Sequence, residues 1–315
     1  MTGLLLRRLA LLLLTLWVTS VLVFLLTAVM PGNVGRIILG PFAAQGAVDA
    51  LNAQLGYDQP VLVRYLRWAG GLVTGDWGRS LRFDVPVLPL VLERLGRSLI
   101  LACASLVLLV PVGVLLGMLA AEREGGPFDR TVTAVGMALG SLPEFVTGVL
   151  LIVVFGLWLG ILPIQALPPE GAGPLDWARH LLMPALCLVV LMFAYVFRMM
   201  RTSTVDALAA DYTRTAVLKG LPRGTVLRRH VLPNALVPTL AVLGTQLGWL
   251  VGGLVVVETL FRYPGLGSLI QFAAAQRDVP LLAGCTMAVA VVYGVGGLLA
   301  DLAQTLLDPR VRRAR

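Results

Sequence analysis

Runs of about 20 apolar residues recur along this chain and constrain its fold more than any other feature. A transmembrane α-helix needs roughly 20 consecutive apolar residues. Of the 315 residues, 58% are hydrophobic and only 13% are charged, so polar side chains are too few to cover a water-facing surface. Six stretches are long enough to cross a bilayer: residues 9–30, 98–120, 131–160, 181–197, 236–260 and 281–307. The sequence therefore predicts an all-α membrane protein with six transmembrane helices.

The first apolar run has two interpretations. Arg7 and Arg8 precede it, and the small residues Thr27 and Ala28 lie near its end, as in a cleaved secretory signal peptide. However, the run is longer than the roughly 7–15 residues of a signal h-region. This length favours a retained membrane anchor.

The orientation is predicted from arginines, because cations in short loops near span ends stay in the cytosol. Arg7, Arg8, Arg123, Arg130 and the tail from Arg310 onward then place both termini inside, N-in/C-in, and residues 31–97 outside. The outer segment also contains arginines, which the rule would place inside. Because loops beyond about 60 residues obey the rule weakly, these arginines do not contradict the orientation. The expected domains are 1–30 (tail and first helix), 31–97 (extracytoplasmic cap), 98–308 (five-helix core with the cytosolic loop 198–235) and 309–315 (cytosolic tail).

The net charge of +8 follows from this topology, so no nucleic-acid partner is expected. Within the outer cap, residues 60–72 place Tyr65 and Trp68 among apolar residues at helical spacing. Such a helix either lies along the membrane surface or packs on the other outer loops.

Small residues recur at every fourth position in three predicted spans. The sets are Gly113 with Gly117, Gly136 with Gly140, and Gly244 with Gly248 and Gly252. In lipid, such faces let helix backbones approach closely. We expect contacts between helices of this chain, and the set in the fifth span is a second candidate, a seam between subunits.

Three polar side chains inside the spans are candidates for a translocation path. Ionisable groups within a bilayer are costly and are functional hypotheses by default. Glu144 follows Pro143 and is expected near mid-membrane, whereas Gln246 and Glu258 belong to the fifth span, with Glu258 near its outer end. A carboxyl that is hydrogen-bonded to a neighbouring helix is the alternative interpretation of Glu144.

Residue patterns for catalysis or metal binding are missing. Lys219 is the only lysine and lies outside any P-loop, which needs a lysine at the phosphates. There is no H-E-x-x-H pair or G-x-S-x-G elbow, and His180 and His230 are predicted on opposite sides of the membrane. Cys103, Cys187 and Cys285 lie inside spans, without metal-ligand spacing, and are expected to be core residues. The sequence indicates neither an enzyme nor a metal site.

Residues 198–235 form a polar, cationic segment between two apolar runs. Asp206–Leu218 is expected to be a short helix that Lys219 and Gly220 terminate. Pro222 suits the first turn of a second helix, and Pro233 disfavours helical geometry at Leu232. Thr215 and Ala216 are small enough to seat against a partner's groove, with charge supplied around them by Arg214, Arg223, Arg228 and Arg229. We expect a rigid knob that docks on a partner.

The spacing in this segment resembles a known motif. Arg214-Thr215-Ala216, Gly220 and Leu232-Pro233 resemble the EAA coupling loop of ABC-importer permeases, although Arg214 replaces an acidic residue and His230 an aliphatic one. The string DYTRTAVLKGL, from Asp211 and Tyr212 through Lys219, is similar to the version in dipeptide and oligopeptide permeases. Further segments resemble the B-type subunit of that subfamily or the subfamily as a whole: LGYDQPVLVRYLRW, GDWGRSL, VVVETLFRYPGLG and LLDPRVR.

This resemblance implies a type I ABC-importer permease fold in the bacterial inner membrane. It also implies a heterodimer with a second, homologous permease, two cytosolic ATPase subunits that bind ATP and Mg, an extracytoplasmic substrate-binding protein and surrounding membrane lipid. The chain itself would bind no cofactor. Its expected function is to form half of the path for di- or oligopeptides and to transmit ATPase motion through the loop.

An ion-coupled secondary transporter for a small solute is the alternative from the residues alone. Such carriers need buried ionisable relays and often internal repeats, for which Glu144 is thin support. The sequence does not determine the substrate, because related systems take dipeptides, longer peptides, nickel complexes, glutathione or oligosaccharides.

Overall fold

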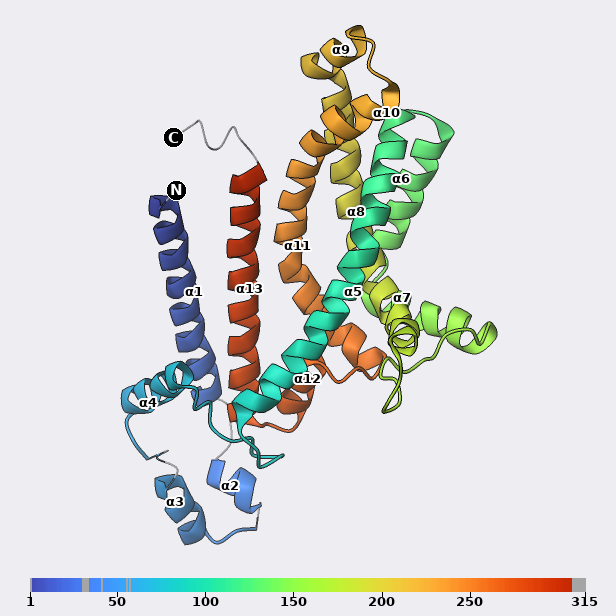
Figure 1. Cartoon of the computed structure of the whole chain (residues 1–315). Coiled ribbons are helices and arrows are strands. Elements are labelled where there is room, and N and C mark those ends of the chain that lie inside the picture. Colours follow the sequence, from blue (N-terminus) through green and yellow to red (C-terminus); the bar gives the residue numbers. More distant parts are fainter. Residues whose placement is uncertain (1, 30–33, 41, 55, 57, 308–315) are drawn as a thin grey trace. The chain divides into compact units, whose positions relative to one another are not determined.

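The computed structural model of the chain is built from helices (Figure 1). It describes residues 2–29, 34–40, 42–54, 56 and 58–307, except for the side chains of 2–5, 27–29, 34, 37, 38, 51, 54, 245–253, 300, 301 and 303–307. The helices are α1 (Thr2–Val29), α2 (Val34–Leu39), α3 (Gln45–Gln54), α4 (Val61–Thr74), α5 (Val87–Glu122), α6 (Pro127–Gly140), α7 (Glu144–Leu151), η1 (Ile152–Trp158), α8 (Pro174–Ala209), α9 (Asp211–Leu218), α10 (Arg223–Val226), η2 (Leu227–Val231), α11 (Leu232–Leu260), α12 (Leu266–Ala275) and α13 (Val279–Leu307). Within the described residues there is no strand, only a single bridge between Arg79 and Pro86. The all-α prediction is confirmed.

Several helices are long and apolar enough to cross a membrane. Four pass this test individually: Leu6–Leu26, Val87–Glu122, Pro174–Ala209 and Val279–Leu299. A fifth span results if the bent pair Pro127–Gly140 and Glu144–Trp158 is one crossing. The backbone of α11 is helical over 29 residues, but residues 245–253 within it have no described side chains. The membrane-spanning class is confirmed, and the count of six remains a prediction.

The third predicted span is not one straight helix. Its two parts, α6 and α7, meet at an angle of 104°. Pro143 lies just before α7 in an extended conformation, with φ −57° and ψ 141°. Proline disfavours helical geometry in the residue before it, so α6 ends ahead of Pro143. The predicted span 131–160 is therefore broken at Pro143, and its assignment as one crossing stays a prediction.

Two helices extend well beyond their predicted spans. Both α5 and α8 contain 36 residues, which corresponds to about 54 Å at the usual rise. The hydropathy pattern suggested that a polar loop begins at residue 198. In the structure, residues 198–209 instead continue α8. Likewise, α5 begins at Val87, inside the segment that was assigned to the cap.

The chain forms two compact units, which are described separately. Unit 1 comprises residues 1–96 and 269–294, and unit 2 comprises residues 97–268 and 295–315. In unit 1, Trp68 and Leu72 of α4 pack against Val23, Ala283 and Met287. The Phe24 ring of α1 contacts the rings of Tyr65 and Trp68, at centroid distances of 5.4 and 5.8 Å.

These contacts show that the predicted amphipathic helix exists as α4. Its aromatic face packs on helix α1, which is neither the membrane surface nor the outer loops that the two interpretations of the sequence offered. Leu62 and Leu66 on the same helix are exposed, so an apolar surface remains for contact with the membrane.

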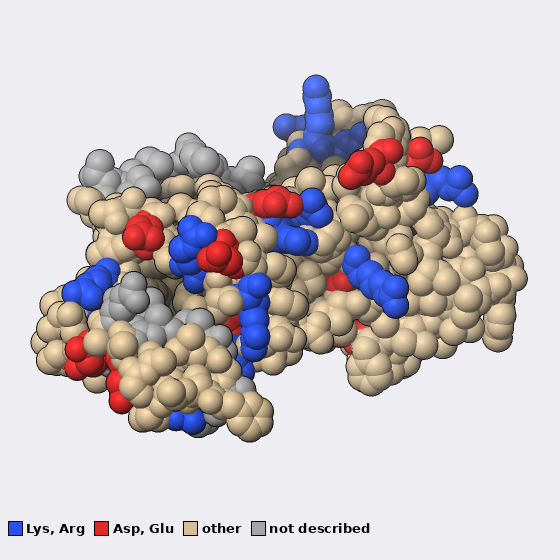
Figure 2. All heavy atoms as spheres, turned by 90° about the horizontal axis from the view of Figure 1, so that it is seen from below, with Lys and Arg blue, Asp and Glu red and all other residues tan. Residues whose placement is uncertain are grey.

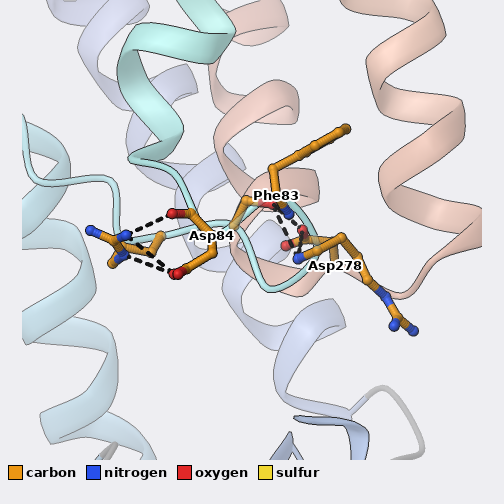
Figure 3. Close-up of polar contacts among 6 residues, drawn as sticks. Phe83, Asp84 and Asp278 are labelled. Carbon is orange, nitrogen blue, oxygen red and sulfur yellow. Dashed lines mark hydrogen bonds and ion pairs between the residues drawn. The ribbon is translucent and has the colours of Figure 1, made fainter.

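The loop between α4 and α5 is held by Asp278, which lies at the turn before α13 (Figure 3). The Ser80 hydroxyl and the Arg82 backbone N–H both donate to Asp278 Oδ2, the second at 3.1 Å. Phe83 stacks on Phe272 at a centroid distance of 4.8 Å. Asp278 is fully buried, so this carboxylate fixes the loop through several partners at once.

In unit 2, α8 is approached closely by two helices at the predicted glycine pairs. A Cβ atom added at Gly113 or Gly117 of α5 would lie 2.8 Å from the side chain of Val196 or Met200. A Cβ added at Gly136 or Gly140 of α6 would lie 3.0 Å from Phe193 or Ala194. The prediction of intrachain contacts is confirmed for both pairs.

Glycines of the fifth span are only partly described. Gly244 lies in α11, but Gly248 and Gly252 fall within 245–253, outside the described side chains. The residues that directly follow the C-terminal end of α11 are fully described. Phe261 and Tyr263 belong to the apolar core of unit 2, together with Leu188, Met192 and Val196 of α8.

Charged side chains are dispersed on the face seen in Figure 2. Blue basic and red acidic residues are scattered over that face, with several side by side and a group of basic residues at its upper edge, and uncharged residues cover most of the rest. Many large apolar side chains are exposed on the long helices, among them Leu99, Val107 and Leu115 of α5. Such a surface is suited to lipid or to another membrane subunit.

Candidate functional site

The polar segment after α8 folds into a compact knob, which we define as residues 207–231. It begins where α8 ends, because Ala210 is extended, with φ −71° and ψ 147°. The Thr213 hydroxyl then donates to the Ala207 carbonyl at 2.6 Å, which folds α9 back on α8. The expected helix Asp206–Leu218 is therefore divided: residues 206–209 belong to α8 and residues 211–218 to α9.

The knob has a small apolar core of its own. Ala207, Ala216, Val226 and Val231 are buried and contact the partly buried Leu208 and Leu227. Ala216 is only 4% exposed. We had expected its small side chain to face a partner, and that expectation was wrong: it faces inward, while the neighbouring Thr215 is exposed.

Gly220 ends α9 as the sequence predicted. Its φ is +74°, a left-handed conformation that glycine adopts without steric cost. The Gly220 N–H donates to the Val217 carbonyl at 2.9 Å, and the Leu221 N–H donates to the Ala216 carbonyl at 3.3 Å. These bonds satisfy carbonyls at the helix end and turn the chain toward α10.

The tip of the knob exposes apolar and cationic side chains together. Leu218 is 79% exposed and Val217 is 59% exposed, and Tyr212 and Leu221 are also exposed. Asp211, Arg214 and Lys219 are exposed on the same short helix and its end. Large exposed apolar residues with a polar rim are typical of a protein interface.

The connection from the knob to α11 differs from the prediction. Leu232 is helical, with φ −53° and ψ −49°, and the chain continues through Pro233 into α11. The π-helix η2 precedes this proline, and Pro233 occupies the first turn of α11, where a missing N–H costs little. Pro233 therefore does not end a helix.

Two ion pairs fasten the knob and the end of α8 to neighbouring helices. Arg223 Nη2 of α10 lies 2.9 Å from Glu122 Oε1, at the end of α5. Arg201 of α8 binds Asp129 of α6 with both branches of its guanidinium, and Nη2 lies 2.7 Å from Oδ2. Bidentate Arg–carboxylate pairs are strong and directional, so the knob is attached to the bundle by more than its own chain.

Sequence reasoning did not identify these pairs. Asp129 and Arg201 are 72 positions apart, and Glu122 and Arg223 are 101 apart. No local spacing connects residues so distant. The one available signal was an acidic residue in the first turn of a helix, Asp129, which the helix dipole favours.

The candidate path residues lie in different surroundings. Glu144 is the first residue of α7, directly after the bend, and is partly exposed. Its backbone carbonyl accepts a hydrogen bond from the Cys187 thiol at 3.3 Å. It therefore lies at a helix break, not in the middle of a continuous span. Gln246 lies outside the described side chains.

Glu258 is a fully buried carboxylate, although its position near the end of α11 suggested an interfacial setting. It accepts hydrogen bonds from the Ser98 hydroxyl and from the Ser268 N–H, the latter at 3.0 Å. The Ser98 oxygen in turn accepts from the Leu266 N–H at 2.8 Å. These bonds tie the turn between α11 and α12 to the start of unit 2 at Ser98.

The same turn holds Tyr263, whose hydroxyl donates to the Arg97 carbonyl at 2.9 Å. Burial, together with the negative charge of Glu258, raises the pKa of Tyr263 to about 12. The hydroxyl therefore stays protonated and remains a donor at any physiological pH.

The remaining reactive side chains form no site within the described part of the chain. No cluster of three or more His, Cys, Asp and Glu residues able to hold a metal occurs there. Cys187 and Cys285 are buried as expected, but Cys103 is exposed on α5, so the expectation that all three cysteines are core residues was wrong for Cys103.

Comparison with known proteins gives the family. The model described as "Binding-protein-dependent transport system inner membrane component" matches residues 113–313, and a second, for the N-terminal part of such membrane components, matches residues 1–98. The chain belongs to this family of transport permeases. The expectations of a multi-pass inner-membrane location and of a non-catalytic transport subunit are thereby confirmed.

Relatives cover nearly the whole permease. It is 36% identical over 307 residues to "Probable peptide ABC transporter permease protein y4tP" of Sinorhizobium fredii, covering 98% of each chain. It is 34% identical over 296 residues to "Oligopeptide transport system permease protein AppB" of Bacillus subtilis, covering 93% of each. A solved structure, "Crystal structure of an amino acid ABC transporter with histidines", reaches a TM-score of only 0.47 at 17% identity, over 70% of the permease and 94% of that chain.

The family is the one that the EAA-like loop and the neighbouring segments resembled, and that expectation is confirmed. Membership of a binding-protein-dependent transport family implies a substrate-binding protein and a separate ATPase as partners. This membership also removes the ion-coupled secondary carrier as an alternative.

Proposed function

We propose that the permease forms half of an ATP-driven import pathway for di- or oligopeptides and receives ATPase motion at the knob. The observation that carries this proposal is the end of α9, where Val217 and Leu218 are strongly exposed. The same helix is packed through the buried Ala216 and is followed by Gly220 in a left-handed conformation. The peptide substrate follows from relatives whose names specify peptide transport.

The proposed membrane arrangement has six spans, with α11 as the fifth and α6 to η1 as a broken third. Both termini and the knob lie in the cytosol, and the segment 31–97 forms the extracytoplasmic cap. The core 98–308 contains the remaining five spans and is followed by the tail 309–315. The apolar composition of α11, which is 29 residues long, supports its assignment as a span.

The knob would dock in a groove of a cytosolic ATPase, which binds ATP and Mg. Apolar contact would come from Tyr212, Val217, Leu218 and Leu221, with Asp211, Arg214, Thr215 and Lys219 at the rim. Gly220 would set the angle between α9 and α10, and Ala216 would stiffen the knob from inside. Leu232 and Pro233 would carry movement into α11.

Movement of the knob would reach the bundle through its ion pairs. Arg223 contacts α5 through Glu122, and Arg201 at the base of the knob contacts α6 through Asp129. A rigid knob attached to three helices can bias a bundle that has two packing arrangements. The two arrangements would open the pathway outward or inward.

A second, homologous permease would complete the pathway, surrounded by membrane lipid. We propose Gly244, Gly248 and Gly252 as part of the seam between the two, because small residues permit close helix approach in lipid. Glu144, Gln246 and Glu258 remain the candidate path residues. Glu144 is the most accessible described member, since it is partly exposed at a helix break, where irregular backbone is tolerated if it faces a cavity.

The test is co-purification from native membranes with a C-terminal tag, followed by mass spectrometry. A second permease and ATPase subunits are expected with the wild-type chain. Leu218→Asp should lose the ATPase subunits but keep the second permease. The matched control is Leu175→Asp on α8, because Leu175 is similarly exposed at 75% but lies far along the helix from the knob. Equal ATPase recovery with Leu218→Asp would contradict docking at this tip.

A further inference from the structure

A cavity of about 490 Å³ lies between α6 and α8 in unit 2. Three arginines, Arg130, Arg198 and Arg201, line one part of it, and Met137, Ala194 and Phe197 line another. The cavity is separate from the exposed tip of α9 and is not used in the proposed docking of the ATPase.

The lining is graded along the two helices. Arg130 and Met137 are seven positions apart on α6, and Ala194 and Arg201 are seven positions apart on α8, which is about 10 Å along each axis. The arginines lie toward the beginning of α6 and the end of α8, the end that the Arg201–Asp129 pair joins. The cavity is therefore cationic near the knob and apolar about 10 Å away from it.

Not all of the positive charge is neutralised. The Asp129 carboxylate neutralises Arg201, with which it forms an ion pair. The Asp129 Oδ2 atom also accepts a hydrogen bond from the Gly125 N–H at 3.0 Å. Within the described part of the chain, neither Arg130 nor Arg198 takes part in an ion pair. Both side chains are exposed at the cavity, so two cations are available to a ligand.

We propose that this cavity binds an anionic phospholipid of the cytoplasmic leaflet. The phosphate would lie between Arg130 and Arg198, and an acyl chain would extend past Phe197 toward Met137 and Ala194. Basic pockets between transmembrane helices on the cytoplasmic side are suited to such headgroups. The leaflet assignment rests on the proposed function, which places the knob in the cytosol.

The apolar part of the cavity favours a lipid over other anions. A free phosphate would contact the arginines only and would leave Met137 and Ala194 without a partner. A phospholipid contacts both parts at once. Its charged phosphate lies at one end of the molecule and its apolar acyl chains at the other, in the same order as the cationic and apolar parts of the cavity. The bound lipid would also lie beside the Arg201–Asp129 pair that anchors the base of the knob.

The test uses the tagged permease with the subunits that co-purify with it, washed free of lipid and titrated with phosphatidylglycerol or phosphatidylcholine. Native mass spectrometry counts the bound lipids, with neither ATP nor peptide present. We expect the wild-type protein to prefer phosphatidylglycerol. Arg130→Gln with Arg198→Gln should weaken that binding about 25-fold, at about fivefold per arginine. Arg130→Lys with Arg198→Lys should retain most of it, and Arg179→Gln, at the opposite end of α8, should leave it unchanged.

Equal phosphatidylglycerol binding by the double Gln variant would overturn the proposal. Displacement of the lipid by millimolar inorganic phosphate, or no preference over phosphatidylcholine, would overturn it as well. If the double Gln variant does not assemble, Met137→p-benzoylphenylalanine gives a second measurement: a lipid adduct after illumination supports the site, and protein crosslinks alone contradict it. Because no step needs transport, failure here is distinct from failure of ATP-driven import.

Discussion

Arg223 of the knob forms an ion pair with Glu122, at a distance of 2.9 Å between Nη2 and Oε1. Glu122 is the last residue of α5, and Arg223 is the first residue of α10. The pair therefore joins the polar knob to a 36-residue helix that continues into the membrane-spanning bundle. Its position suits transmission of movement better than it suits stabilisation, because Arg223 is 77% exposed.

Arg223→Glu should lower peptide uptake per ATP hydrolysed several-fold. The reason is that the knob would move without pulling α5. The stability of the permease should change by only about 1 kcal/mol, since the Arg223 side chain is 77% exposed although that of Glu122 is 16% exposed. Uptake and hydrolysis are measured together in proteoliposomes. The charge-swapped variant, Arg223→Glu with Glu122→Arg, should recover coupling. If the single variant couples normally, the pair has no role in transmission.

The pair of Asp129 and Arg201 should behave differently because Asp129 is only 4% exposed. Arg201→Met leaves a buried carboxylate without its main partner, which costs about 3–5 kcal/mol in buried pairs. We expect a clear fall in the melting temperature of the purified permease. Adding Asp129→Asn should restore much of the loss, since it removes the unpaired charge. Strictly additive effects of the two substitutions would show that the residues do not interact.

Gly117 should tolerate no side chain. A Cβ atom at this position would lie 2.8 Å from Met200 Cβ and 3.1 Å from the backbone N of Arg201, so α5 and α8 would have to separate. Gly117→Ala is expected to destabilise by about 1–3 kcal/mol, as overpacking does. Gly96→Ala is the matched control on α5, because nothing lies within 4 Å of its Cβ, and alanine should stabilise that helix by up to about 1 kcal/mol. Similar melting temperatures for both variants would contradict the close approach.

Asp278 should control the loop before α5. Asp278→Ala removes the acceptor of the Ser80 hydroxyl and of the Arg82 and Leu281 N–H groups, and leaves these donors buried or partly buried. Amide hydrogen exchange in residues 78–86 should then accelerate by at least about tenfold, given about 1–3 kcal/mol for each unsatisfied group. Ser80→Ala removes fewer of these bonds and should have a smaller effect. Unchanged exchange in Asp278→Ala would mean that the loop is held by other contacts, such as Phe83 on Phe272.

Features with a local physical cause could be predicted from the sequence. Gly220 ends α9 because a left-handed conformation is needed there, and the glycine pairs of α5 and α6 lie against α8 because small residues four apart share one helix face. Hydropathy indicated the long helices but not their ends, since α8 continues through polar residues up to Ala209.

Features that depend on residues far apart in the chain could not be predicted. Pro143 bends the third span sharply, whereas Pro111 and Pro184 lie inside continuous helices, and the local sequence does not separate these outcomes. The burial of Glu258 depends on Ser98, which lies 160 positions away. Ala216 turned inward because Val226 and Val231 fold over it, which the pattern of α9 alone does not reveal.

The central claim is that ATP drives peptide import through contact at the knob, and one measurement addresses it directly. The tagged complex is reconstituted in proteoliposomes with its binding protein, and uptake of a labelled peptide is followed with ATP and an ionophore that abolishes ion gradients. We predict ATP-dependent uptake that is unaffected by the ionophore, lost in Leu218→Asp and retained in Leu175→Asp. Uptake that needs an ion gradient, or that proceeds normally in Leu218→Asp, would contradict the claim.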